Sequence, residues 1–166
     1  MPNANFSTSS AVPSRKFVTH STEETIARGR EIGAGLKPPA LVLLRGDLGV
    51  GKTTLTKGIA SALGAASEDE VTSPTFTLVH KYEVNPNVQA GAAAATTAPP
   101  VYHVDLYRVG DFRDLETLGL EDVLSENAIV VVEWPDKLSI HTEWPVIRIH
   151  IEHIAEDERR ITIATD

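Results

Sequence analysis

The sequence predicts an α/β fold in which helices flank a mixed β-sheet. Two unbroken apolar runs, at residues 41–44 and 128–133, are typical of parallel strands that are covered on both faces. Apolar residues at helical spacing lie between these runs. Residues 146–151 and 160–163 alternate between apolar and polar side chains, which predicts a closing antiparallel hairpin. Parallel and antiparallel strands together make the expected sheet a mixed one.

Length, composition and charge restrict the classes of function. The 166 residues fit one domain, and a hydrophobic content of 42% is ordinary. The absence of cysteine excludes disulfides, thiolate metal sites and cysteine nucleophiles. No apolar run approaches the ~20 residues that span a bilayer, and the N-terminus lacks the pattern of a secretory signal. We therefore expect a cytoplasmic protein, and its net charge of -8 disfavours direct binding to nucleic acid.

The first helix is expected over residues 22–36. Residues 1–15 carry almost no large apolar side chains, which predicts a disordered tail followed by one ordered domain over residues 16–166. Ser21 and Glu24 form a capping-box pattern, and apolar residues then follow on one helical face. Two consecutive prolines end this helix before the first apolar run.

The middle of the chain predicts two strands around an insert. Residues 74–83 and 101–107 are rich in Thr, aromatic and β-branched residues, so both are expected to be strands. Residues 84–100 carry no charge, little bulk and three prolines, and we interpret them as a flexible insert. A short helix, broken near Gly119, is expected before the second apolar run.

The stretch GDLGVGKTT, directly after the first apolar run, carries the clearest chemical signal. Gly46, Gly51, Lys52 and Thr53 match G-x-x-x-x-G-K-[ST], the phosphate-binding loop of P-loop NTPases. Glycines permit positive φ angles that turn backbone N–H groups toward a β-phosphate, and the following helix adds its positive N-terminus. Lys52 is expected to reach the β- and γ-phosphates, and the Thr53 hydroxyl is a hard oxygen ligand that suits Mg²⁺. The sequence therefore predicts a single P-loop NTPase domain.

Such an enzyme also needs a carboxylate for Mg²⁺ and a group that places the attacking water. Glu133 ends the second apolar run, where a buried carboxylate is costly unless it meets a metal or a partner. Asp105 ends the strand VYHVD in the same way. The alternative for either residue is a strand-end acid that faces water or pairs with a neighbour such as Arg108.

Four further residues are assigned to packing. His80 and His103 lie in expected strands with no His or Cys at ligand spacing around them, so we interpret them as packing histidines. Trp134 and Trp144, each followed by proline, are expected to anchor the core or an interface.

The motifs GDLGVGKTTL, SPTFTLVHKYE, VYHVDLYR, DLETLGLEDVL and VVVEWPDKL, in that order, resemble the bacterial TsaE family, the ATPase of tRNA threonylcarbamoyladenosine biosynthesis. The runs SPTFTLV, DLYR and VEWP carry most of the specificity, and the match covers nearly all of residues 16–165. The resemblance implies an ATPase that binds ATP and Mg²⁺ and works with the TsaD and TsaB proteins. That complex attaches threonylcarbamoyl to the adenosine beside the anticodon, so the ATPase contacts tRNA only indirectly.

The resemblance also implies roles for individual residues. Thr53 and Glu133 correspond to the Mg²⁺ ligands, Thr22 to a position near the base, and Asp105 to the acid needed for hydrolysis. With Lys52, the two acids form the expected catalytic set. Thr75 lies in a segment similar to a nucleotide-sensing switch. The expected phosphate cradle consists of Gly49, Val50, Gly51, Lys52, Thr53 and Thr54.

Three other functions share the loop. A small-molecule or nucleoside kinase would need an acceptor pocket and arginines on a lid, but arginine is sparse and no lid-like segment is apparent. A GTPase-type switch is expected in many cases to carry an N-K-x-D signature, which is absent. The third alternative is a protein that binds nucleotide only as a structural ligand.

Overall fold

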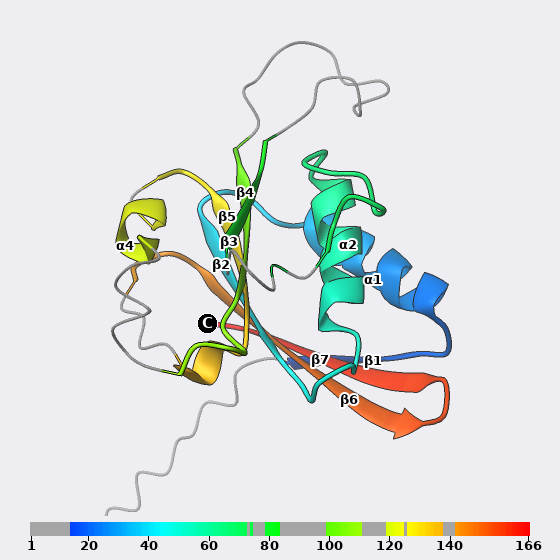
Figure 1. Ribbon diagram of the computed structural model, residues 1–166. Coiled ribbons are helices and arrows are strands. Elements are labelled where there is room, and N and C mark those ends of the chain that lie inside the picture. Colours follow the sequence, from blue (N-terminus) through cyan, green and yellow to red (C-terminus); the bar gives the residue numbers. More distant parts are fainter. Residues whose placement is uncertain are drawn as a thin grey trace, which may run out of the picture.

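The computed structural model describes residues 14–72, 74, 79–83, 99–110, 119–124, 126–137 and 142–166. Within these residues, seven strands form one sheet in the order β1-β7-β6-β2-β5-β4-β3 (Figure 1). The strands are β1 (Ser14–Thr19), β2 (Ala40–Arg45), β3 (Val79–Tyr82), β4 (Val101–Asp105), β5 (Ile129–Glu133), β6 (Val146–Ala155) and β7 (Glu158–Thr165). The helices are α1 (Thr22–Ala34), α2 (Lys52–Ala62), α4 (Leu120–Val123) and the 3-10 helix η1 (Pro135–Lys137).

The centre of the sheet is parallel and its two ends are antiparallel. β2 pairs in parallel with β5 and with β6, and β4 pairs in parallel with β5. The pairs β3–β4, β6–β7 and β1–β7 are antiparallel. The predicted α/β fold with a mixed sheet is therefore confirmed. Because the carboxyl ends of β2, β4 and β5 meet at one edge, the residues that end these strands lie near one another.

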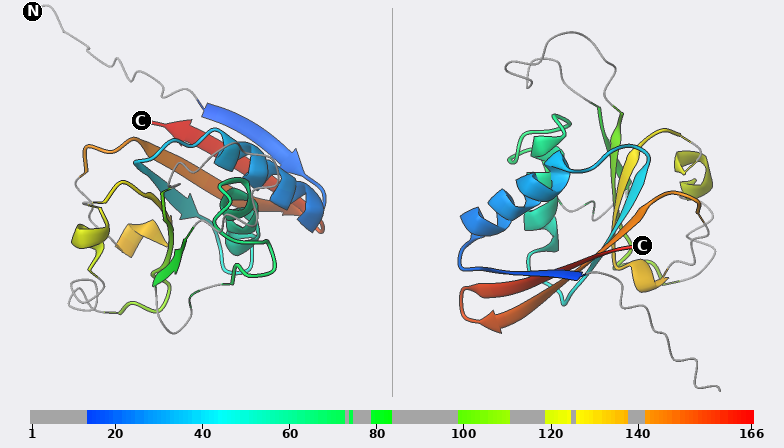
Figure 2. Two further views of the ribbon diagram at one scale, coloured as in Figure 1. Left: turned by 90° about the horizontal axis from the view of Figure 1, so that it is seen from above. Right: turned by 180° about the vertical axis from the view of Figure 1, so that it is seen from behind.

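The two predicted apolar runs lie at the centre of this sheet. Every residue from Ala40 to Leu44 and from Ile129 to Glu133 is buried. α1 and α2 lie on one side of the sheet, and α4 and η1 lie on the other (Figures 1 and 2). Each side has its own apolar cluster, so β2 and β5 are covered on both faces.

Glycines bring α1 and α2 into direct backbone contact. Gly29 and Gly33 of α1 face Gly58 and its neighbours in α2, and a Cβ atom added at Gly58 would lie 2.1 Å from the Ile26 carbonyl oxygen. Ser21 caps α1, since its hydroxyl accepts a hydrogen bond from the Glu24 N–H at 3.1 Å, as the capping-box pattern predicts. This packing places the N-terminus of α1 beside the loop that precedes α2 (Figure 2).

The helix and strand bounds differ from the predictions in a few places. The expected tail extends to residue 15, whereas Ser14 and Arg15 belong to β1, which pairs with β7. Of the strand predicted over 74–83, β3 lies within the described residues 79–83, and residues 75–78 lie outside the described part of the chain. The strand predicted over 101–107 ends at Asp105, where a turn begins. Residues 1–13, residues 84–98 of the predicted insert and the first part of the short helix lie outside the described residues. No helix in the described part of the chain is both long and apolar enough to cross a membrane.

Candidate functional site

The glycine-rich loop joins β2 to α2 at the carboxyl edge of the sheet. Gly49 and Gly51 have φ angles of 76° and 121°, which side-chain-bearing residues rarely adopt. A Cβ atom at either position would meet no atom within 4 Å, so open space lies in front of the loop. The positive φ angles expected from the sequence are confirmed here, and the loop leads directly into the N-terminus of α2 at Lys52.

An open pocket of about 260 Å³ lies over this loop. Its walls come from the loop, from α2 and from the ends of β4 and β5. Asp105 and Glu133, which the sequence placed at two strand ends, are direct neighbours in the β4–β5 register and both line the pocket. The described residues that line it are Leu48, Gly49, Gly51, Lys52, Thr53, Thr54, Asp105, Glu133 and Trp134.

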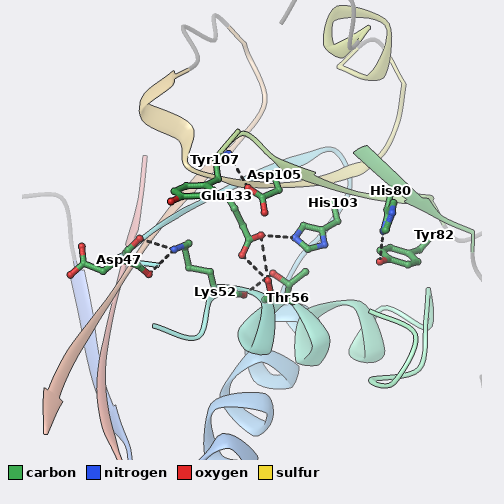
Figure 3. Close-up of polar contacts among 11 residues, drawn as sticks. Asp47, Lys52, Thr56, His80, Tyr82, His103, Asp105, Tyr107 and Glu133 are labelled. Carbon is green, nitrogen blue, oxygen red and sulfur yellow. Dashed lines mark hydrogen bonds and ion pairs between the residues drawn. The ribbon is translucent and has the colours of Figure 1, made fainter. Parts of the chain in front are cut away.

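The Lys52 ammonium is held at the mouth of the loop (Figure 3). Its Nζ donates hydrogen bonds to the carbonyl oxygens of Gly46 at 2.7 Å and Asp47 at 2.9 Å. The Trp134 ring covers the same ammonium, with Nζ 4.3 Å from the ring centroid. Burial lowers the pKa of Lys52 from its ordinary value, while nearby carboxylates, Glu133 first, oppose that shift.

Glu133 is a buried carboxylate with two donors (Figure 3). Its side chain is only 3% exposed, at the end of an otherwise apolar strand. Thr53 Oγ1 lies 3.1 Å from Glu133 Oε1 and donates to it from the first turn of α2. His103 Nε2 lies 3.1 Å from Glu133 Oε2 and approaches from β4. Thr53 and Glu133, separated by 80 residues in sequence, thus meet at the pocket as the Mg²⁺ hypothesis requires.

Asp105 begins a turn at the end of β4. One of its carboxylate oxygens accepts a hydrogen bond from the Tyr107 N–H at 3.0 Å, which shapes the turn that follows the strand. Lys137 Nζ donates to the carbonyl oxygens of Tyr107 and Val109, so η1 and this turn are joined. The Asp105 carboxyl group therefore has a defined place in the pocket wall.

A second, smaller pocket of about 160 Å³ adjoins the same loop. Gly49, Gly51 and Thr54 line both pockets. Thr22, which the sequence associates with the base, lines the second pocket from the N-terminus of α1. The other described residues in its wall are Ser21, Thr25, Val50, Asp157 and Arg159.

Arg159 is a functional neighbour that the sequence analysis did not find. Its Nε donates to the Val50 carbonyl oxygen at 2.9 Å, which ties the β6–β7 hairpin to the glycine-rich loop. Arg159 also donates through Nη1 to the carbonyl oxygens of Glu156 and Glu158. More than 100 residues separate Arg159 from the loop, so no local sequence pattern could have connected them.

Trp134 and His103 also take part in the site. Trp134 has a φ angle of 61°, which is rare for a bulky residue, and its ring contacts that of Tyr107 at a centroid distance of 5.0 Å. It packs against one apolar cluster, as expected, and also covers Lys52. His103 is a fully buried packing residue, as expected, but no pattern in the sequence indicates its contact with Glu133. Thr75 lies outside the described residues.

Comparison with known proteins agrees with this geometry. A family model described as "Threonylcarbamoyl adenosine biosynthesis protein TsaE" matches residues 19–161. The chain belongs to the TsaE family. The predicted family is thereby confirmed, and the match includes the glycine-rich loop and both acids of the pocket.

Individual TsaE proteins align with most of this chain. The chain is 37% identical over 147 residues to a tRNA threonylcarbamoyladenosine biosynthesis protein TsaE from Bacillus subtilis, covering 89% of this chain and 83% of that relative. The protein of the same name from Aquifex aeolicus is 35% identical over 150 residues, with coverage of 90% and 95%. The crystal structure of Bacillus subtilis YdiB aligns with a TM-score of 0.68 and 32% identity, covering 93% of this chain and 86% of that one.

Proposed function

We propose that this TsaE-family protein is a Mg²⁺-dependent ATPase that supports threonylcarbamoyladenosine modification of tRNA. The observation that carries this proposal is the pocket at the end of β2. There the glycine-rich loop, Lys52 and the hydrogen-bonded pair Thr53–Glu133 face one open space. Such a loop with a lysine and a hydroxyl–carboxylate pair suits a triphosphate and its metal ion.

The charges in the pocket support a requirement for Mg²⁺. Among the described residues that line it, Lys52 is the only cation, and it lies opposite the carboxyl groups of Asp105 and Glu133. A triphosphate brought alone to this pocket would meet net negative charge. Thr53 and Glu133 offer the hard oxygen atoms that Mg²⁺ prefers. The described residues contain no cluster of three His, Asp or Glu side chains that could form a different metal site. These two residues would hold Mg²⁺, which neutralises phosphate charge when bound.

The remaining residues have roles that follow from their positions. The backbone N–H groups from Gly49 to Thr54 and the N-terminus of α2 receive the β-phosphate. Lys52 leaves the loop carbonyl oxygens for the phosphates, because a charged acceptor makes a stronger hydrogen bond than a neutral carbonyl. Asp105 lines the same pocket as the register neighbour of Glu133, and it corresponds to the acid that the family resemblance links to hydrolysis, so we assign the orientation of the attacking water to Asp105.

The second pocket is the proposed place of the adenosine. It shares the loop with the first pocket, so a nucleotide that lies along the loop would reach both. Thr22 lies in its wall, and Thr25 is held there by a 2.8 Å hydrogen bond between the Thr19 and Thr25 hydroxyl groups. This arrangement supports the assignment of Thr22 to the base.

We further propose that the activity depends on TsaD and TsaB. Rapid hydrolysis on this type of loop usually needs a second positive charge at the γ-phosphate, worth about a thousandfold or more in rate. Arg45 is paired with Asp136 at 2.7 Å, and Arg159 is bonded to backbone carbonyl oxygens at the second pocket. The isolated protein should therefore bind ATP but turn it over well below the ~10 per second typical of enzymes. The net charge of -8 fits a cytoplasmic protein that reaches tRNA only through its partners.

The test is steady-state phosphate release from ATP and GTP, measured with the protein alone and with a TsaD–TsaB complex. We expect slow Mg²⁺-dependent release from ATP that changes when the complex is added. Lys52→Ala should lose most of the triphosphate affinity. Lys57→Ala is the matched control, since Lys57 lies in the same helix but lines neither pocket. Unchanged ATP affinity in Lys52→Ala, or phosphate transfer to a small acceptor in place of water, would reject the proposal.

A further inference from the structure

His103 has a contact that its role as a packing residue does not require. The side chain is fully buried in β4, on the face that α2 covers, and its Nε2 lies 3.1 Å from Glu133 Oε2. Figure 3 shows the imidazole beside the carboxyl group, between the strand and α2. An apolar side chain of similar volume would fill the same space without the cost of burying two ring nitrogens. The polar ring is therefore explained better by its partner than by packing.

The surroundings of the ring indicate which nitrogen carries the proton. His103 Nδ1 is buried and has no hydrogen-bond partner among the described residues. A neutral ring protonated at Nε2 donates to Glu133 and leaves only an acceptor lone pair at Nδ1. The opposite tautomer would place a lone pair against the carboxylate and leave a buried N–H without a partner, which is the costlier arrangement. The Nε2–H tautomer therefore fits this site.

We infer that His103 is a positioning residue for Glu133: its Nε2–H holds the carboxylate in the orientation in which it receives the metal ion. This inference rests on the proposed Mg²⁺ site. Thr53 and His103 donate to the same carboxyl group from α2 and from β4. If the Thr53 hydroxyl were to bind the metal ion, His103 would still hold Glu133 as a donor. Donors of this kind to a ligating carboxylate typically change metal affinity by about 10–100-fold.

The neighbouring histidine supplies a matched control. His80 of β3 is the direct register partner of His103, and its Nδ1 lies 3.2 Å from the Tyr82 hydroxyl. It is half-buried in the same region of the sheet, and the partner found for its ring is Tyr82 instead of Glu133. Replacing His80 therefore disturbs the sheet in the same place without removing a donor from the proposed metal ligand.

The experiment measures metal affinity apart from activity. Mn²⁺ is titrated into the full-length protein saturated with ADP and followed by electron paramagnetic resonance, while ADP affinity is measured separately in EDTA. We expect His103→Leu to bind Mn²⁺ about 10–100-fold more weakly, with metal-free ADP affinity unchanged. His103→Gln, which keeps an N–H donor near the Nε2 position, should recover most of the affinity, and His80→Leu should resemble the wild type.

The outcomes separate this inference from the proposed function. If the wild type binds no Mn²⁺ in the presence of ADP, the proposed metal site is wrong. If the wild type binds Mn²⁺ and His103→Leu binds it equally well, only the inference about His103 is wrong. An equal loss in His80→Leu would also overturn it, since the effect would then come from the sheet. Should His103→Leu not fold, nitrogen-15 spectra of the wild-type imidazole decide: an Nδ1–H tautomer, or an Nε2–H signal that Glu133→Gln leaves unmoved, refutes the inference.

Discussion

The contact between α1 and α2 makes a sharp prediction for Gly58→Ala. The new Cβ would lie 2.1 Å from the Ile26 carbonyl oxygen, 2.8 Å from the Arg30 nitrogen and 2.9 Å from Gly29 Cα. All three are backbone atoms, so no side chain can rotate away. These distances are roughly 1 Å shorter than an ordinary contact of ~3.5 Å, and the two helices must separate to relieve them.

The size of the effect follows from two opposing contributions. Overpacking of this kind costs about 1–3 kcal/mol, whereas alanine gains about 1 kcal/mol over glycine in a helix interior. Gly35→Ala is the control, because Gly35 ends α1 with φ of -90° and its Cβ would come no closer than 3.6 Å to another atom. Both substitutions lower the conformational entropy of the unfolded chain by the same amount. The difference in stability between the two variants therefore measures the cost of the contact between α1 and α2. We expect Gly58→Ala to be about 2 kcal/mol less stable than Gly35→Ala, or roughly 4–8 °C in melting temperature.

The same substitution should affect nucleotide binding. α1 carries Ser21 and Thr22 to the second pocket, and α2 begins at Lys52, so separating the helices moves two walls of the proposed nucleotide site apart. Thermal and urea unfolding give the stability, and titration with ATP gives the affinity. Gly58→Ala should lower both the stability and the ATP affinity, and Gly35→Ala should lower neither. Equal stability of the two variants would refute the argument that the glycines permit a backbone contact.

The remaining predictions concern the pocket and the sheet beside it. Glu133→Gln should fold and bind ADP in EDTA, yet lose most Mg²⁺-dependent phosphate release, and a wild-type rate would reduce Glu133 to a strand-end acid. Asp105→Asn should bind ATP with near-normal affinity and hydrolyse it poorly, so normal turnover would contradict its role with the water. Burial lowers the pKa of His80, so the unfolded chain takes up a proton before the folded one as the pH falls. Wild-type stability should therefore fall as the pH drops below about 6.5, and His80→Gln should flatten that fall in urea midpoints measured across this range.

The sequence predicts those helices and strands whose formation depends on residues that are close together in the chain. β2 and β5 are continuous apolar runs because both of their faces are covered, and α1 carries its own cap at Ser21. β1 could not be predicted in this way, since Thr19 is its only fully buried residue. Its order comes from backbone pairing with β7, whose sequence lies more than 130 residues away.

The same distinction applies to the site. The loop and Lys52 are contiguous in sequence, so a pattern of eight residues was enough to find them. The meeting of Thr53 with Glu133 depends on the placement of β5 beside β2, which the apolar runs suggest but do not determine. The contacts of His103 and Arg159 depend on strand register and on the approach of a distant hairpin, for which the sequence carries no local sign.

The register of β4 explains how the polar residues of the site are held in place. Tyr102 and Val104 point into the apolar cluster on the α4 side of the sheet, together with Val130 and Val132 of β5. His103 and Asp105 alternate with them and therefore face α2 and the glycine-rich loop. A slip of one residue would send the imidazole and the carboxylate into this apolar cluster and turn Tyr102 and Val104 toward the side of α2 and the glycine-rich loop. Because that exchange is energetically costly, the packing of Tyr102 and Val104 on the α4 side of the sheet fixes the strand register. The same register places His103 and Asp105 at the pocket on the other side.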